Sequence, residues 1–261
     1  MRYLDNLVKI KEIITNDGDT VEVFELLSNM PDEIFNEWAA HFRHNYCSDQ
    51  LLEQLISGTS YSKQEYLLAF KFPDAKVDFG PATRSGDFAE LLISDYLEFS
   101  LGYIVPRERY TNKYNRNSST QGTDVIAYKI QNSGPNSTDE MITFEVKAQA
   151  SGTTAKNRLQ DALDDSYKDP IRKGETLSAL KQLYIEKGNY QQAAQIERFQ
   201  NKPDRPYIDR YGAAAVHDSE NYSETVIKSA KQQTEKRWMI VVKRENLMQL
   251  VHRLYEVASQ C

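Results

Sequence analysis

Two strand-like segments, at 123–130 and 141–148, constrain the fold of this chain more than any other part of its sequence. Both are rich in β-branched and aromatic residues, and the run at 131–137 between them consists largely of Gly, Pro, Asn and Ser. We therefore expect an antiparallel hairpin. Apolar residues at helical spacing precede the hairpin, from Ser85 as the N-cap to Gly102, and others follow it at 155–167.

The remaining patterns place the chain in the α/β class. A weaker strand pattern at 102–110 contains Pro106, which suits only an edge or bulged strand. Two apolar strand patterns at 211–216 and 237–242 flank a predicted helix near 220–235, and a helix at 245–259 closes the chain. We expect a mixed sheet flanked by helices.

The helical period fails between residues 72 and 81, so we predict a domain boundary near residue 80. Residues 1–80 are predicted to form an irregular, α-rich segment, and residues 81–261 the core domain. Within the core, positions 174–200 look like one tetratricopeptide-type helix pair. A single repeat cannot bury its own face, and we interpret the pair as an inserted helical hairpin.

Charge and composition exclude several classes of protein. The chain has a net charge of −6, but residues 1–80 contain 7 basic and 14 acidic residues, so a partner protein is expected to face them. No apolar run approaches the roughly 18 residues of a membrane helix, and two cysteines make no disulfide framework. We expect a cytoplasmic protein with no membrane contact and no small-molecule substrate. A Gly-rich phosphate loop is missing, so ATP hydrolysis would need another subunit.

Acids and one lysine gather around the predicted hairpin. Strand alternation places Glu145 and Lys147 on one face, with the apolar residues between them on the other. Asp124, near the start of the partner strand, comes next to Glu145 across the ladder. Glu90, on the preceding helix, is placed to reach the same position. Three carboxylates and one ammonium group are thus expected together.

Clustered carboxylates repel one another unless a cation lies between them, and hard oxygen ligands favour Mg²⁺, with Mn²⁺ as a substitute. The expected ligands are Asp124, Glu145, the backbone carbonyl of Val146, and Glu90. A metal-bound water then becomes nucleophilic, while Lys147 orients it or stabilises charge on a phosphate. This chemistry is phosphodiester hydrolysis.

Alone, Glu-x-Lys is a weak signal, because such pairs are common on solvated strand faces. Together with the Gly-x-Asp of the partner strand and the helices on either side, however, it resembles the PD-(D/E)xK nuclease core. Asp87 is an alternative to Glu90 as the first acid of that core, although a helix-dipole role explains Asp87 better.

More narrowly, four segments resemble the DUF1837 family, to which the HamA nuclease subunits of Hachiman anti-phage systems belong: 86–92, 122–125, 144–147 and 158–169. The resemblance spans about residues 80–245. It implies a metal-dependent DNA endonuclease that a HamB-type helicase subunit restrains and that is released during infection. The alternative is a non-catalytic assembly subunit that keeps the nuclease fold to bind DNA or a helicase.

Several other residues have a possible role in the same site. Gln149 continues the face of Lys147 and suits a hydrogen bond to a phosphate or a metal-bound water, or simply ends the strand. Four further residues are candidates for DNA contact, with plain solvation as the alternative: Arg116, Lys156, Arg158 and Gln160.

A rival metal site lies at 41–47, where His41, His44 and Cys47 are spaced by three residues. Structural zinc needs four ligands, and no second cluster supplies the fourth. We do not expect zinc.

Overall fold

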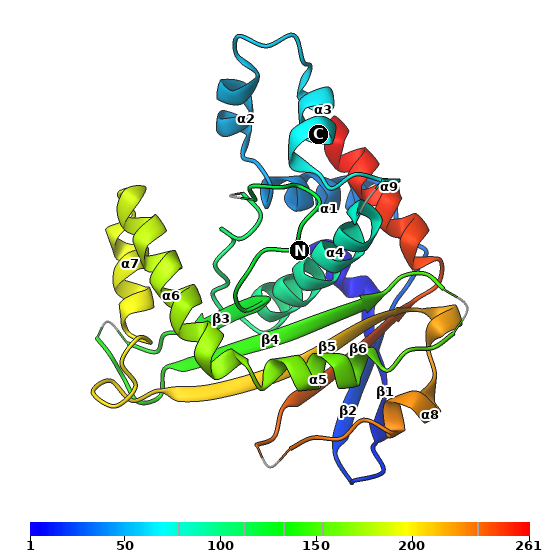
Figure 1. The fold of residues 1–261 in the computed structure, drawn as a ribbon, viewed down its shortest axis with the longest axis vertical. Coiled ribbons are helices and arrows are strands. Elements are labelled where there is room, and N and C mark those ends of the chain that lie inside the picture. The colour runs from blue at the N-terminus through cyan, green and yellow to red at the C-terminus, as the bar shows by residue number, and fades with distance from the viewer. Residues whose placement is uncertain (78, 112, 133, 153, 234) are drawn as a thin grey trace.

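The computed structural model describes residues 1–261 except positions 78, 112, 133, 153 and 234. Its centre is a six-stranded mixed sheet in the order β1-β2-β6-β5-β4-β3 (Figure 1). The four inner strands run parallel, and the two edge strands, β1 and β3, pair antiparallel. This architecture confirms the α/β class. The strands are β1 (Leu7–Ile14), β2 (Thr20–Leu26), β3 (Val125–Lys129), β4 (Glu140–Gln149), β5 (Ile208–Asp218) and β6 (Trp238–Arg244).

Helices cover both faces of the sheet. Apolar residues of α4 and α9 pack on one face, and those of α5 and α8 on the other (Figure 1). Among the described residues, no helix combines the length and apolar character that crossing a membrane requires. The helices are α1 (Asp32–His44), α2 (Asp49–Ile56), α3 (Lys63–Tyr66), α4 (Gly80–Asp95), α5 (Arg158–Ser166), α6 (Asp169–Glu186), α7 (Tyr190–Glu197), α8 (Glu224–Lys228) and α9 (Leu247–Gln260).

The predicted hairpin is present as β3 and β4, paired antiparallel with Val125 opposite Phe144. The edge strand predicted at 102–110 is not formed. Within this segment only Ile104 pairs with the sheet, through an isolated bridge to Tyr128. Pro106 has no N–H to continue the ladder, so the chain leaves the sheet edge. Position 133, in the predicted turn, lies outside the described residues.

Two helix predictions are also corrected. The first core helix begins at Gly80, and Ser85 lies inside it, where its hydroxyl donates to the carbonyl of Ala82 at 2.9 Å. Of the helix expected at 220–235, the described residues form a 3-10 turn at Ser219–Asn221 and the short α8, which Ser223 caps. Position 234 lies outside the described residues.

Residues 1–80 are not simply α-rich, because they contribute two strands to the sheet. β2 pairs parallel with β6, and β1 forms the edge. The ring of Tyr3 stacks on Trp38 at 4.1 Å, and Trp38 contacts Phe88 of α4, so the core is continuous across residue 80. Lys9, Lys11 and Glu12 interrupt the apolar residues of the half-exposed β1, which hides its strand pattern.

The inner strands are buried on both faces and packed closely. At Gly212 of β5, an added Cβ would lie 2.3 Å from the ring of Phe144. The helices α6 and α7 form a hairpin against β3 and β4, with Leu177, Ile196 and Phe199 in a small core of their own.

The burial of His217 in β5 predicts that the fold loses stability at acidic pH. This residue is 3% exposed, and burial, followed by the charge of Arg158, lowers the pKa of His217 to about 4. The unfolded chain takes up this proton below its ordinary pKa near 6.5, so stability falls as pH drops from 6.5 towards 4. We expect this residue alone to account for about 2 kcal/mol of lost unfolding free energy at pH 5.

Urea denaturation at pH 7 and pH 5 measures the effect. The loss between the two pH values should be smaller in His217→Gln than in the wild type, whereas His44→Gln, at a surface histidine, should match the wild type. An equal loss in all three proteins would contradict the assignment.

Candidate active site

Strand β4 holds Glu145 and Lys147 on one face, as the alternation predicts, while Phe144 and Val146 belong to the core on the opposite face. Lys147 Nζ lies 2.7 Å from Glu145 Oε1. It also lies 2.7 Å from a carboxylate oxygen of Asp165. The glutamate and the lysine therefore form one hydrogen-bonded unit.

Asp124 lies directly before β3, and a tight turn fixes it there. Gly122 has φ +95°, and a Cβ at this position would lie 2.7 Å from Thr176 Oγ1 of α6. The next N–H, of Thr123, donates to the same oxygen at 3.1 Å. Asp124 Oδ2 in turn accepts from the N–H of Val146 at 3.0 Å. The N–H and C=O of one strand residue point the same way, so the carbonyl of Val146 also faces the side of Asp124.

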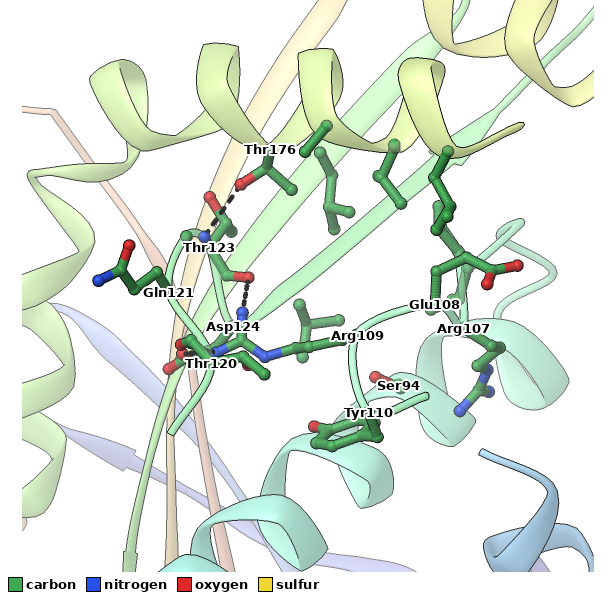
Figure 2. Close-up of a pocket in the computed structure, with 18 of the residues that line it drawn as sticks. Ser94, Arg107, Glu108, Arg109, Tyr110, Thr120, Gln121, Thr123, Asp124 and Thr176 are labelled. Atoms are coloured by element: carbon green, nitrogen blue, oxygen red, sulfur yellow. Dashed lines mark hydrogen bonds and ion pairs between the residues drawn. The ribbon is translucent and has the colours of Figure 1, made fainter. Parts of the chain in front are cut away.

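Arg109 joins Asp124 to Glu90. Figure 2 shows Arg109 beside Asp124. The Nη2 of Arg109 donates to Asp124 Oδ1 at 2.9 Å, and its Nε lies 3.0 Å from Glu90 Oε2. The hydroxyl of Tyr110 also donates to Glu90 Oε2, at 2.6 Å. Glu90 belongs to α4, on the sheet face opposite Glu145, so the two glutamates approach Asp124 from different sides.

Burial controls the protonation of these acids. It raises the pKa of Glu90 to about 8, although Arg109 opposes the shift. Burial and then the charge of Asp124 raise the pKa of Glu145 to about 7. Burial likewise raises the pKa of Asp169 to about 6. Burial lowers the pKa of Lys147, but the hydrogen bonds that its ammonium group donates to Asp165 and Glu145 outweigh burial and raise that pKa overall. Lys147 is therefore a permanent cation.

A row of ion pairs connects α4 to the irregular segment 105–116. Lys113 Nζ lies 2.5 Å from Asp87 Oδ2, and Arg107 Nη2 lies 2.7 Å from an oxygen of Asp95. Asp87 also accepts from the hydroxyl of Tyr46, so its interactions are internal to the core.

Among the described residues, no three His, Cys, Asp or Glu side chains are grouped to hold a metal ion. Mg²⁺ usually keeps several waters and needs only one or two carboxylates. Asp124, Glu145 and the carbonyl of Val146 fit that smaller donor set, because the charge of Asp124 reaches Glu145 and Val146 bonds to Asp124. Glu90 is ion-paired to Arg109, and that pair would have to open before Glu90 became a ligand.

The three residues of the rival metal site have separate surroundings. His41 Nε2 contacts Asp95 at 3.0 Å, His44 contacts Asp49, and Cys47 is buried.

The other predicted site residues lie outside this cluster. Gln149 Nε2 donates to the carbonyl of Thr154 and to Asn221, which closes the loop after β4. Arg116 binds the carbonyls of Leu68 and Phe72.

The three candidates on and before α5 differ in their surroundings. Arg158 pairs with Asp161, and Gln160 bonds to Asp164 and to the backbone of Lys231. Lys156 is exposed, so its ammonium group is accessible to a binding partner. Whether any of these residues touches DNA stays a prediction.

The sequence assigns no role in this site to three of its charged residues: Asp165, Arg172 and Arg109, which it indicates only as part of a basic loop suited to a nucleic-acid backbone. Arg172 Nη1 lies 3.2 Å from Glu145 Oε2, so both oxygens of this carboxylate contact a cation. Asp165 lies in the 158–169 segment that carried the family resemblance, which was an available signal. Arg109 lies in a loop without periodicity, and no pattern assigned it a partner.

A protein-family model described as HamA matches residues 1–258, almost the whole chain. The N-terminal segment is therefore part of the match, in contrast to the range of about 80–245 expected from the motifs. A search of curated proteins finds no match.

Replacing Arg109 by Met should leave the carboxylates of Glu90 and Asp124 free to bind a cation. The variant leaves Glu90 and Asp124 without their shared counter-charge, and we expect a loss of about 3 kcal/mol in unfolding free energy. Added Mg²⁺ should restore more of the melting temperature in this variant than in the wild type, because binding to the native state stabilises it.

Arg107→Met is the matched control, since Arg107 pairs with buried Asp95 away from the candidate ligands. It should also lose stability, but Mg²⁺ should raise its melting temperature no more than it raises that of the wild type. Equal Mg²⁺ effects on both variants would contradict the proposed metal position.

Proposed function

This chain belongs to the HamA family, whose members are associated with Hachiman anti-phage defence, and we propose that it acts there as a metal-dependent DNA endonuclease. The observation that carries the proposal is the joining of Asp124 to the Glu145-x-Lys147 strand through the Val146 N–H. The β3–β4 hairpin, with α4 on one face and α5 on the other, supports a PD-(D/E)xK arrangement.

Asp124, Glu145 and the carbonyl of Val146 would hold Mg²⁺, or Mn²⁺ in its place. When bound, the ion supplies Lewis acidity and lowers the pKa of a coordinated water. Lys147 stays protonated because its pKa is raised, so it donates hydrogen bonds and stabilises negative charge on the phosphate instead of accepting a proton. Glu145 and Asp165 contact its ammonium group and so fix its position beside the proposed metal ligands.

A second candidate function is a non-catalytic assembly subunit that binds DNA or a helicase. One observation favours it: Asp124 and Glu90 share Arg109, and Glu145 contacts Arg172 and Lys147, so three cations already oppose the charge of these three acids. The two functions differ in one assay. Incubation of the chain with supercoiled DNA and Mg²⁺ or EDTA, with and without the partner, gives metal-dependent DNA conversion only for a nuclease.

For the partner, we propose a HamB-type helicase subunit that contacts the acidic N-terminal part. The charge of −7 over residues 1–80 disfavours a DNA backbone there. Exposed acids on α1 and α2, including Glu33 and Glu53, present that charge at the surface. Deleting residues 1–80 would remove β1 and β2 from the sheet, so the contact is better tested by surface substitutions.

Glu145→Gln and Lys147→Met should each abolish DNA cleavage, with residual activity below about 1% of the wild type, because each removes a group that acts on the phosphate or its metal. Both variants should remain folded. Cleavage of supercoiled plasmid and thermal melting measure the two properties.

The matched control is Glu140→Gln, which removes the same charge at the other end of β4, where Glu140 pairs with Arg210. It should cleave like the wild type. A folded Glu145→Gln protein with normal cleavage would falsify the assignment.

Reversing charge at Glu33 and Glu53 together should weaken co-purification with a HamB-type helicase subunit. Their own ion pairs, with Arg2 and Lys63, are exposed and contribute little to stability. Reversal at Glu220 and Glu245, two exposed acids elsewhere, is the control. Undiminished recovery of the first variant would move the partner surface away from α1 and α2.

A further inference from the structure

A cavity of about 470 Å³ lies between α6, the start of β3 and the segment 105–110 (Figure 2). Its walls are mostly apolar: Leu91 of α4, Val105 of the segment, and Ala179, Leu180 and Leu183 of α6. Asp124 and Arg109 form its inner end, so the cavity adjoins the candidate active site but extends away from Glu145 and Lys147.

The cavity opens where an edge strand is left unpaired. Tyr128 of β3 exchanges two backbone hydrogen bonds with Ile104, at 2.8 and 2.9 Å. Backbone groups of alternate strand residues point the same way, so the N–H and C=O of Ile126 also face outward. Among the described residues, neither group has a hydrogen-bond partner on that side. The chain departs from the edge at Val105 and Pro106, and the cavity takes the place of the missing strand.

Two buried hydroxyls in the wall of the cavity also have no hydrogen-bond partner within the described part of the chain. Thr123 is 2% exposed, and its hydroxyl makes no hydrogen bond. The buried hydroxyl of Thr120, which lines the same end, has none either. Both hydroxyl oxygens are shielded from the open space of the cavity, so the polar groups that an occupant can reach are those of the Ile126 backbone and of the rim.

The rim of the cavity is acidic. Four carboxylates line it against two arginines, and both arginines are ion-paired. Glu175 and Glu186 on α6 are exposed and have no ion pair within the described part of the chain. This charge repels phosphate groups and attracts ammonium or guanidinium groups.

We propose that this cavity is the docking site for an extended peptide segment of another protein, which pairs with Ile126 of β3, places an apolar side chain between Val105 and Leu183, and carries lysine or arginine residues beside Glu175 and Glu186. Strand addition at a sheet edge gives affinity through the backbone, and the cavity and rim give selectivity. A nucleobase would suit the cavity size but would bring its phosphates to the acidic rim.

Selection of a random heptapeptide library against the full chain, in EDTA-containing buffer, tests the proposal without requiring nuclease activity. The selected sequences should share a central apolar residue with flanking lysine or arginine. A synthetic consensus peptide should bind Ala179→Trp at least about tenfold more weakly than the wild type, a loss equal to about 1.4 kcal/mol.

Ser178→Trp is the matched control, because Ser178 is exposed on α6 but does not line the cavity; its binding should change less than about twofold. Glu175→Lys should also weaken binding, and Glu245→Lys should not. N-methylation of the peptide residue opposite Ile126 should reduce affinity, because it removes a strand hydrogen bond.

Three results would overturn the proposal. Selected peptides that are acidic, or that all bind the wild type and Ala179→Trp equally well, would exclude a basic peptide at this site. Equal binding of the consensus peptide to Ala179→Trp would place it elsewhere. Displacement of the peptide by single-stranded DNA, with the DNA also sensitive to Ala179→Trp, would assign the cavity to nucleic acid.

Discussion

The structure depends on keeping buried carboxylates neutralised along α4. Asp87, Glu90 and Asp95 face the core of a helix that packs directly on the sheet, where an uncompensated charge is costly. Lys113, Arg109 and Arg107 meet these three acids in reverse order, all from one irregular segment. The charge pairs therefore hold a segment that has almost no backbone pairing of its own, and they place the wall of the cavity beside β3.

The need to neutralise buried carboxylates also determines the arrangement of the candidate active site. Asp124 and Glu90 share Arg109, and Glu145 lies between Lys147 and Arg172. A divalent cation would therefore exchange with arginine side chains instead of entering an uncompensated acidic cluster. The ion pairs balance these acids without a metal, so a cation would bind only by displacing Arg109 of the 105–110 segment or Arg172 of α6.

Predictions that relied on local periodicity succeeded. The β3–β4 hairpin and the placement of Glu145 and Lys147 on one strand face follow from the period of two, which needs no knowledge of distant residues. Predictions that relied on weak or mixed patterns are wrong. The residues of β1 and β2 have the sequence pattern of an α-rich segment, and residues 102–110 have the pattern of a strand, but neither forms that structure. In both cases long-range pairing decided the outcome, through β6 for the first and through the ion pairs to α4 for the second.

The sequence by itself determined the α/β class, the order of the main elements and the two residues, Glu145 and Lys147, that share a face. These features depend on the chemistry of neighbours along the chain. Only the tertiary structure decided that Glu90 and Glu145 approach Asp124 from opposite faces and that Arg109 lies between Asp124 and Glu90. The reason is physical: a buried charge must find its partner wherever the fold brings one, and no spacing in the sequence specifies that distance.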